Sequence, residues 1–176
     1  MTERIIIAGS GGQGIMLLGK VLAEAAMRLD KFVTWLPAYG AEVRGGTAHC
    51  MVIISDKQIG SPYIDKADTL IIMNSPSLQK FKNRIKNKGL FIINSSLAAK
   101  DIETNGRVVK HSFTDLAIEL GNIKVANMLA LGTFISEKHT VDLKTVFSVI
   151  ESIAPPDKRA LIEINKKALE KGARLK

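Results

Sequence analysis

The chain has 176 residues, of which 46% are hydrophobic and 24% charged, and its formal net charge is +8. This length predicts one domain spanning residues 1–176, with enough apolar residues for a sizeable core. No apolar run approaches a membrane span, and the N-terminal Met-Thr-Glu-Arg is unlike a secretory signal, so we expect a cytoplasmic protein with no membrane partner. The single cysteine, Cys50, cannot by itself form a disulfide, an iron–sulfur site or a zinc site, and we predict no metal site.

Short apolar runs alternate with amphipathic stretches along the chain. This alternation predicts an α/β fold, a three-layer α/β/α Rossmann-like domain with a mostly parallel sheet and a helical C-terminal part. The expected strands cover residues 4–8, 31–36, 47–55, 69–73, 90–94 and 107–110. The expected helices cover residues 13–29, 113–120, 126–138, 142–153 and 158–173, and a further, basic helix has Pro76 in its first turn.

Caps and turns are also predicted from the sequence. Asp142 and Asp157 each precede a periodic apolar stretch, so we expect both to cap helices, and we favour the same role for Asn127. Residues 37–46 are expected to form a long loop because a proline and several glycines interrupt any regular period. Residues 56–58 resemble a hairpin turn.

A glycine loop lies between the first predicted strand and the first predicted helix. Gly9, Gly11 and Gly14 supply a tight turn, a close backbone approach and a helix–strand contact. The N-terminus of the helix offers unpaired N–H groups and a positive dipole to an anion. The sequence therefore predicts a site for a phosphate-bearing ligand, with Lys20 as a candidate contact to an outer phosphate.

A second loop, residues 37–46, follows the second predicted strand and is expected to emerge at the same sheet edge as the glycine loop. It contains Arg44 beside Gly45 and Gly46. A guanidinium makes two parallel charge-assisted bonds to a phosphate or carboxylate, which suits a binding role. A surface ion pair with Glu42 explains Arg44 equally well, so both interpretations stay open.

Two familiar nucleotide sites fit poorly. A nicotinamide site needs an acidic residue at the carboxyl end of the second strand, where this chain has Trp35, Leu36 and Pro37, while Asp30 precedes the strand. A P-loop needs Gly-Lys-Ser/Thr after the glycines, which is missing. No nucleophile with its base and no carboxylate pair is recognisable, so we expect no catalytic residue in this chain.

Basic residues gather on the predicted helix after Pro76, where apolar residues interleave with them at helical spacing. A solvated helix face is the simpler interpretation of this pattern. A surface that binds an anionic partner protein is the more specific one. Because aromatic residues make up only 5% of the chain and no stacking motif is present, we expect no nucleic-acid partner. The basic residues are Lys80, Lys82, Arg84, Lys86 and Lys88.

Four segments taken together resemble the gamma subunit of 2-oxoacid:ferredoxin oxidoreductases. They are GSGGQGI at residues 9–15, PAYGAEVRGGTA at 37–48, SDKQIGSP at 55–62 and NMLALG at 127–132. The resemblance implies a subunit of a complex that oxidatively decarboxylates a 2-oxoacid, with 2-oxoglutarate favoured, forms an acyl-CoA and reduces ferredoxin. It also implies alpha, beta and delta-type partner subunits, which carry thiamine diphosphate and the iron–sulfur clusters.

The resemblance further implies that this subunit helps to bind coenzyme A. The glycine loop would present N–H groups to the phosphates, and basic side chains would supply charge. The cofactor-binding residues expected on this basis are Gly9, Gly11, Gly12, Gln13, Gly14, Lys20, Arg44, Gly45 and Gly46. A stand-alone regulatory module that binds a nucleotide or NAD(P) is the alternative, and it would fold and bind its ligand without partner subunits.

Overall fold

The computed structural model describes residues 1–38, 47–98, 102–154 and 159–176. It confirms the predicted α/β class and most of the predicted elements. The strands are β1 (Thr2–Ser10), β2 (Phe32–Ala38), β3 (Thr47–Ser55), β4 (Ala67–Ile72), β5 (Ile85–Asn94) and β6 (Arg107–His111). The helices are α1 (Ile15–Arg28), α2 (Ser75–Phe81), α3 (Phe113–Glu119), α4 (Ala126–Lys138), α5 (Leu143–Ile153) and α6 (Arg159–Ala173), with short 3₁₀ turns η1 (Lys82–Arg84) and η2 (Ile123–Val125).

The six strands form one sheet in the order β2-β3-β1-β4-β5-β6. β1, β4, β5 and β6 are parallel neighbours. β3 is antiparallel to both β1 and β2. Since β3 runs against both of its neighbours, β2 points the same way as β1, and the carboxyl ends of β1, β2 and β4 share one edge of the sheet.

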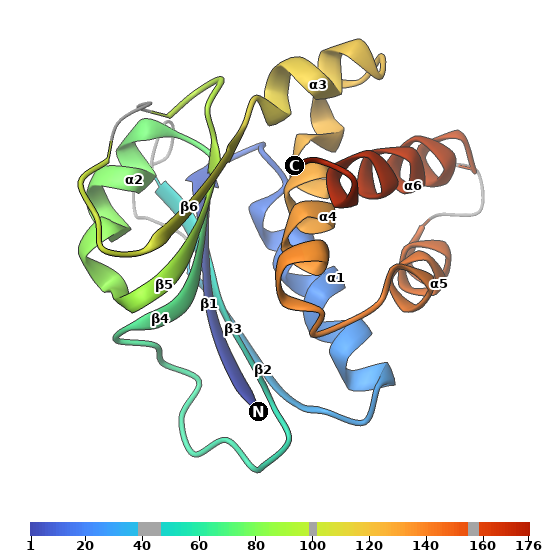
Figure 1. Cartoon of the computed structure of the whole chain (residues 1–176). Coiled ribbons are helices and arrows are strands. Elements are labelled where there is room, and N and C mark those ends of the chain that lie inside the picture. Colours follow the sequence, from blue (N-terminus) through green and yellow to red (C-terminus); the bar gives the residue numbers. More distant parts are fainter. Residues whose placement is uncertain (39–46, 99–101, 155–158) are drawn as a thin grey trace.

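The alternation of side chains along β1 divides the core in two. Ile5 and Ile7 are buried on the face that α1 and α4 cover. Ile6 and Ala8 are buried on the opposite face, together with Leu78 of α2. Figure 1 shows this three-layer arrangement, with α2 on one side of the sheet and α1 and α4 on the other. An apolar residue at every position of a strand is the pattern expected when both faces of a sheet are covered.

α5 and α6 lie outside the layer that α1 and α4 form, so they cover other helices and not the sheet (Figure 1). α6 packs closely against α4 because each helix has a glycine that faces the backbone of the other. A Cβ atom added to Gly132 would lie 2.1 Å from the carbonyl oxygen of Leu169, and one added to Gly172 would lie 2.1 Å from that of Leu129. The close approach of these two helices therefore depends on the absence of both side chains.

Two predicted features are wrong. The basic helix ends at Phe81, and Lys86 lies in β5, which starts at Ile85 and not at residue 90. The ammonium group of Lys86 binds the Asp68 carboxylate at 2.6 Å, a tertiary contact that local helical spacing does not reveal. Residues 56–58 do not begin a hairpin either, since the described chain between β3 and β4 contains no further strand and instead buries Ile64.

Among the described residues, no helix is both long enough and apolar enough to cross a membrane. The predicted cap at Asp142 is confirmed, because its carboxylate accepts the backbone N–H of Thr145 at 2.8 Å at the start of α5. The predicted cap at Asp157 lies outside the described residues.

Replacing Asp142 by alanine is expected to lower the free energy of unfolding by about 1 kcal/mol at neutral pH, the usual value of such a cap. The bond from the Thr145 N–H, ahead of the other interactions, holds the pKa of Asp142 below its ordinary value. The carboxylate therefore contributes its stability above about pH 4, and this contribution is lost as pH falls through the lowered pKa. Urea unfolding at several pH values measures the effect. Asp142→Asn keeps the cap and should show little loss at neutral pH; an equal loss in both variants would contradict the capping role.

Candidate functional site

The candidate site lies at the carboxyl edge of the sheet, between β1 and β4. The chain leaves β1 toward α1 on one face, and leaves the neighbouring strand β4 toward α2 on the other (Figure 1). Such a reversal of direction opens a crevice at the strand ends, where open α/β sheets bind ligands. The walls of the crevice include Gly12 and Gln13 of the glycine loop, residues 9–14, and Met73, which directly follows β4.

The glycines of the loop have different reasons to lack side chains. Gly9 is buried, and a Cβ there would lie 2.6 Å from Oε1 of Gln13 and 2.7 Å from Cδ1 of Ile15. Gly12 and Gly14 have φ values of 87° and 71°, which disfavour any other residue. Gly11 is exposed, and apart from its chain neighbours none of the described residues has an atom within 4 Å of where its Cβ would be. A ligand that approaches the backbone at Gly11 is consistent with that space.

Gln13 makes two hydrogen bonds within the loop, both to Ser10. Its Oε1 accepts the N–H of Ser10 at 2.7 Å, and its own backbone N–H donates to the Ser10 carbonyl at 3.2 Å. The backbone N–H of Gln13 therefore closes the turn of the loop. The N–H groups of Gly11 and Gly12 make no hydrogen bond to the described residues, so they remain available as donors.

Hydrogen bonds connect the residues at the end of β4 to the glycine loop. Asn74 donates from Nδ2 to Oγ of Ser10 at 2.5 Å, while its Oδ1 accepts the N–H of Ser77 and so caps α2. The Met73 carbonyl accepts Nδ2 of Asn94 at 3.2 Å and Nε2 of Gln13 at 3.4 Å. These bonds hold the two walls of the crevice in one position. Asn74 comes just after β4 and Asn94 ends β5, a position typical of binding sites, although the sequence alone singled out neither of them.

Asn127 does not cap α4, contrary to the prediction. The cap position is Val125, and Asn127 lies within the helix with only 2% of its surface exposed. Its Nδ2 donates to the Gly14 carbonyl at 3.1 Å, a contact across 113 residues of sequence. Its Oδ1 is buried and has no partner among the described residues. Asn127 therefore supports the glycine loop from behind, in a role that only the tertiary fold reveals.

A cavity of about 140 Å³ adjoins the loop. Gly12 and Gln13 form one part of its lining, and Thr114 and Lys124 another. Oγ1 of Thr114 accepts a bond from Nδ2 of Asn94 at 2.9 Å, which leaves the hydroxyl hydrogen available to an acceptor. The other lining residues are Met73, Leu97, Ile123 and Ala126. The cavity thus combines hydrogen-bond donors and one ammonium group with apolar walls.

The second predicted loop cannot be placed in the same detail, since Arg44, Gly45 and Gly46 lie outside the described residues. Its flanking residues are described, and they confirm that the loop leaves the expected sheet edge. Ala38 at the end of β2 pairs with His49, and Thr47 at the start of β3 pairs with Ser10 beside the glycine loop.

Lys20 is exposed on α1, and it does not line the cavity beside the glycine loop. It lies six residues beyond Gly14, which corresponds to about 9 Å of helical rise. The β2 strand itself carries no acidic residue, and Asp30 precedes it at the opposite edge of the sheet. The ribose-binding acid of a nicotinamide site is therefore missing from β2.

His49 and Cys50 are adjacent on β3 and point to opposite faces of the sheet. The His49 ring lies 4.8 Å from that of Phe81 on the α2 side, while Cys50 is buried on the α1 side. Burial raises the pKa of the Cys50 thiol to about 12, which keeps it protonated at neutral pH. Among the described residues, no group of three His, Cys, Asp or Glu side chains is arranged to hold a metal ion.

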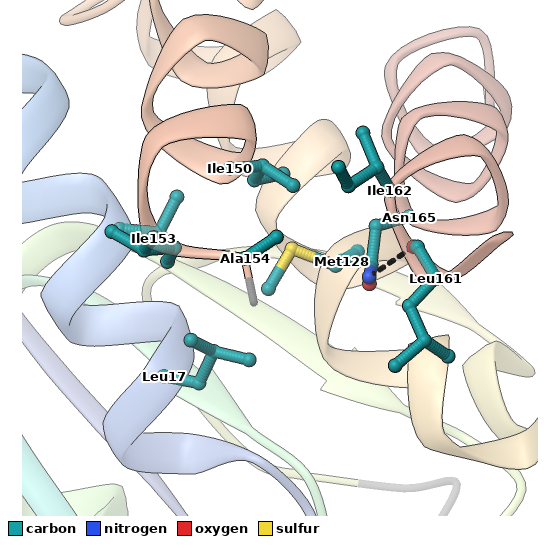
Figure 2. A pocket seen from close by; sticks show the side chains of 9 residues that line it. Leu17, Met128, Ile150, Ile153, Ala154, Leu161, Ile162 and Asn165 are labelled. Carbon is teal, nitrogen blue, oxygen red and sulfur yellow. Dashed lines mark hydrogen bonds between the residues drawn. The ribbon is translucent and has the colours of Figure 1, made fainter. Parts of the chain in front are cut away.

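A second cavity, of about 180 Å³, lies between α1, α5 and α6 (Figure 2). Its lining is almost wholly apolar, and Leu17 and Ile150 are examples. The amide of Asn165 is the polar side chain in the lining, and its Nδ2 donates to the Leu161 carbonyl at 2.6 Å (Figure 2). Without a cation or a set of donors, this cavity is unsuited to phosphate, so the glycine-loop crevice is the better candidate for the anion site.

The family profile described as pyruvate ferredoxin/flavodoxin oxidoreductase matches residues 4–175. The chain belongs to this oxidoreductase family. Ketoisovalerate oxidoreductase subunit VorA of Methanothermobacter marburgensis is 35% identical over 170 residues, covering 97% of this chain and 36% of VorA. 2-Oxoglutarate synthase subunit KorC of Methanocaldococcus jannaschii is 32% identical over 159 residues, covering 88% of this chain and 85% of KorC. The chain thus spans about a third of VorA but most of KorC.

Solved structures of the oxidoreductase family have the same fold. The gamma subunit of a keto/oxoacid ferredoxin oxidoreductase from Geobacter sulfurreducens matches with a TM-score of 0.83 and 29% identity, covering 97% of this chain and 95% of that one. A 2-oxoglutarate:ferredoxin oxidoreductase from Magnetococcus marinus, solved with 2-oxoglutarate, coenzyme A and succinyl-CoA bound, matches with a TM-score of 0.89 at 23% identity. The match covers 98% of this chain and 30% of that one. The predicted likeness to gamma subunits is confirmed.

Proposed function

We propose that the chain is the gamma-type subunit of a 2-oxoacid:ferredoxin oxidoreductase and that its glycine loop binds the phosphates of coenzyme A. The family match over residues 4–175 and the gamma-subunit structure that aligns over 97% of the chain support the subunit assignment. The observation that carries the ligand assignment is the glycine loop at the reversal point of the sheet, where Gly11 and Gly12 have N–H groups without partners among the described residues.

The proposed reaction is oxidative decarboxylation of a 2-oxoacid to an acyl-CoA, with electrons passed to ferredoxin. Thiamine diphosphate and iron–sulfur clusters would supply the carbanion and electron-transfer chemistry. We assign both to alpha, beta and delta-type partner subunits, since one buried cysteine is not the donor set of a cluster. Within this proposal the present chain holds the coenzyme and does not perform the redox chemistry.

Each residue of the glycine loop has a distinct part in holding the coenzyme. Gly11 and Gly12 donate N–H groups to the diphosphate, while Gly9, Gln13 and Gly14 give the loop its shape. The positive end of α1 stabilises the negative charge. The loop with Arg44, Gly45 and Gly46 is the expected source of further contacts and charge, whereas Lys20 lines none of the cavity and is assigned no contact in this proposal. Coenzyme A does not need a ribose-binding acid on β2, which fits the composition of that strand.

We favour 2-oxoglutarate as the substrate because KorC is a relative of nearly the same length, whereas VorA extends far beyond the match. The test is to purify the complex that contains this chain and to assay it with 2-oxoglutarate, pyruvate, 2-oxoisovalerate and indolepyruvate. We expect thiamine- and cluster-bearing chains to co-purify, and turnover to require coenzyme A. A chain that purifies alone and binds NAD(P) would support the stand-alone module instead.

Arg44→Ala is expected to weaken coenzyme A binding by the complex about tenfold, because a charge-assisted contact to a phosphate is lost. Isothermal titration calorimetry measures the change in Kd. Arg174→Ala provides the matched control, since Arg174 is exposed beyond the end of α6 and should leave the affinity unchanged. Unaltered affinity in the Arg44 variant would favour the interpretation of Arg44 as a surface ion-pair residue.

A further inference from the structure

The cavity beside the glycine loop has its own cation, which is not one of those expected from the sequence. Among the described residues that line it, Lys124 is the only basic side chain. Lys124 belongs to η2, more than one hundred residues after the loop, so the tertiary fold brings the two together. Its side chain is exposed and has no ion pair or hydrogen-bond partner in the described part of the chain. An ammonium group without a partner retains its full capacity to bind an anion.

The backbone around Lys124 is well anchored. Its N–H donates to the side-chain oxygen of Asn122 at 3.0 Å, and the next residue, Val125, is only 2% exposed. The N–H of Asn122 in turn donates to the Ala117 carbonyl of α3 at 3.0 Å. Because η2 is held by these contacts, the position from which the Lys124 side chain extends is set by the fold.

The groups near Lys124 suit a diphosphate. Gly12 contributes an N–H without a partner among the described residues, and the hydroxyl hydrogen of Thr114 is available because its oxygen already accepts a bond from Asn94. Leu97 and Ile123 also line the cavity and are 47% and 55% exposed, so an apolar surface adjoins the donors. A ligand with a charged diphosphate next to a less polar chain, as in coenzyme A, matches both features.

We propose that Lys124, and not Lys20, is the lysine that binds the diphosphate of coenzyme A against the glycine loop. This inference rests on the proposed function. It identifies a specificity-determining residue of the same site: a ligand without the diphosphate gains nothing from Lys124. Lys20 extends from the exposed surface of α1 and lines none of this cavity, whereas Lys124 and Gly12 line it together.

The test measures the Kd of coenzyme A, of 3′-dephospho-coenzyme A and of pantetheine for the purified complex, by calorimetry at low ionic strength. Lys124→Met should weaken both diphosphate ligands about tenfold and leave pantetheine binding unchanged. Lys124→Arg should restore most of the affinity, because it keeps the charge. Lys20→Met is the matched control and should remain within twofold of the unsubstituted complex. Raising the salt concentration should reduce the difference caused by Lys124→Met.

Three results would overturn the inference while leaving the proposed function intact. The first is normal affinity in Lys124→Met, and the second is an equal loss in Lys20→Met, which would indicate a general effect of net charge. The third is a loss seen with coenzyme A but not with the 3′-dephospho form, which would place the lysine at the other phosphate. If the unsubstituted complex binds no coenzyme A, both the proposed function and the inference fail.

Discussion

Gly132→Ala is expected to lower the free energy of unfolding by about 3 kcal/mol, at the upper end of the usual effect of overpacking a core. The added Cβ would lie 2.1 Å from the Leu169 carbonyl oxygen and 2.9 Å from the backbone nitrogen of Ala173. Both are backbone atoms of α6, and backbone atoms cannot relieve a clash by changing rotamer as a side chain can. The whole helix must move away from α4, and the buried side chains of Leu169 and Ala168 lose part of their packing.

Urea or thermal unfolding of the variant measures this loss. Gly172→Ala should have a similar effect, because it meets the Leu129 carbonyl at 2.1 Å from the other side of the same contact. Gly60→Ala is the matched control: in the described part of the chain, apart from its chain neighbours, no heavy atom lies within 4 Å of its added Cβ, so little change is expected. If Gly132→Ala were as stable as Gly60→Ala, the close approach of α4 and α6 would be wrong.

The fold was predictable from the sequence wherever local pattern and tertiary burial agree. Residues 126–138 were predicted as a helix and form α4 with those bounds, and residues 47–55 form β3 in the same way. Both segments have long apolar patterns that the buried core requires. The direction of β3 was not predictable, because a strand buried on both faces has the same composition whether its neighbours run parallel or antiparallel.

Predictions from local spacing failed where a distant partner determines the outcome. Lys86 lies in a strand and binds Asp68 of the neighbouring strand, and Asn127 lies within α4 with its amide bound to Gly14. The glycine loop itself was predictable, since its turn depends on residues that are adjacent in sequence. Lys124 was not, because its place beside that loop depends on how α3, η2 and α4 pack.

Gly14→Ala is expected to affect both stability and ligand binding. Gly14 has a φ of 71°, and a Cβ there would lie 2.3 Å from Nδ2 of Asn127. Backbone strain costs about 1–2 kcal/mol, and displacement of the buried amide should bring the total to about 3 kcal/mol. If the glycine loop binds coenzyme A as proposed, shifting it should weaken the affinity about a hundredfold, since positioned donors lose their geometry.

Gly12→Ala separates the cost of backbone strain from the cost of displacing the Asn127 amide. Gly12 has a φ of 87°, but apart from its chain neighbours none of the described atoms lies within 4 Å of its added Cβ, so this variant should show the backbone strain alone and lose less stability than Gly14→Ala. Urea unfolding of both variants and calorimetry with coenzyme A on the purified complex provide the comparison. Equal stability losses would mean that the contact with Asn127 costs nothing.

A double-mutant cycle isolates the contact between Gly14 and Asn127. Asn127→Ala removes the amide, and its remaining Cβ would lie 3.6 Å from the Cβ added at residue 14, an ordinary packing distance. Asn127→Ala alone should cost about 1–2 kcal/mol, because the Gly14 carbonyl loses a buried donor. The double variant should then be at least about 1 kcal/mol more stable than the sum of the single losses predicts. Additive losses would show that Asn127 does not hold the loop.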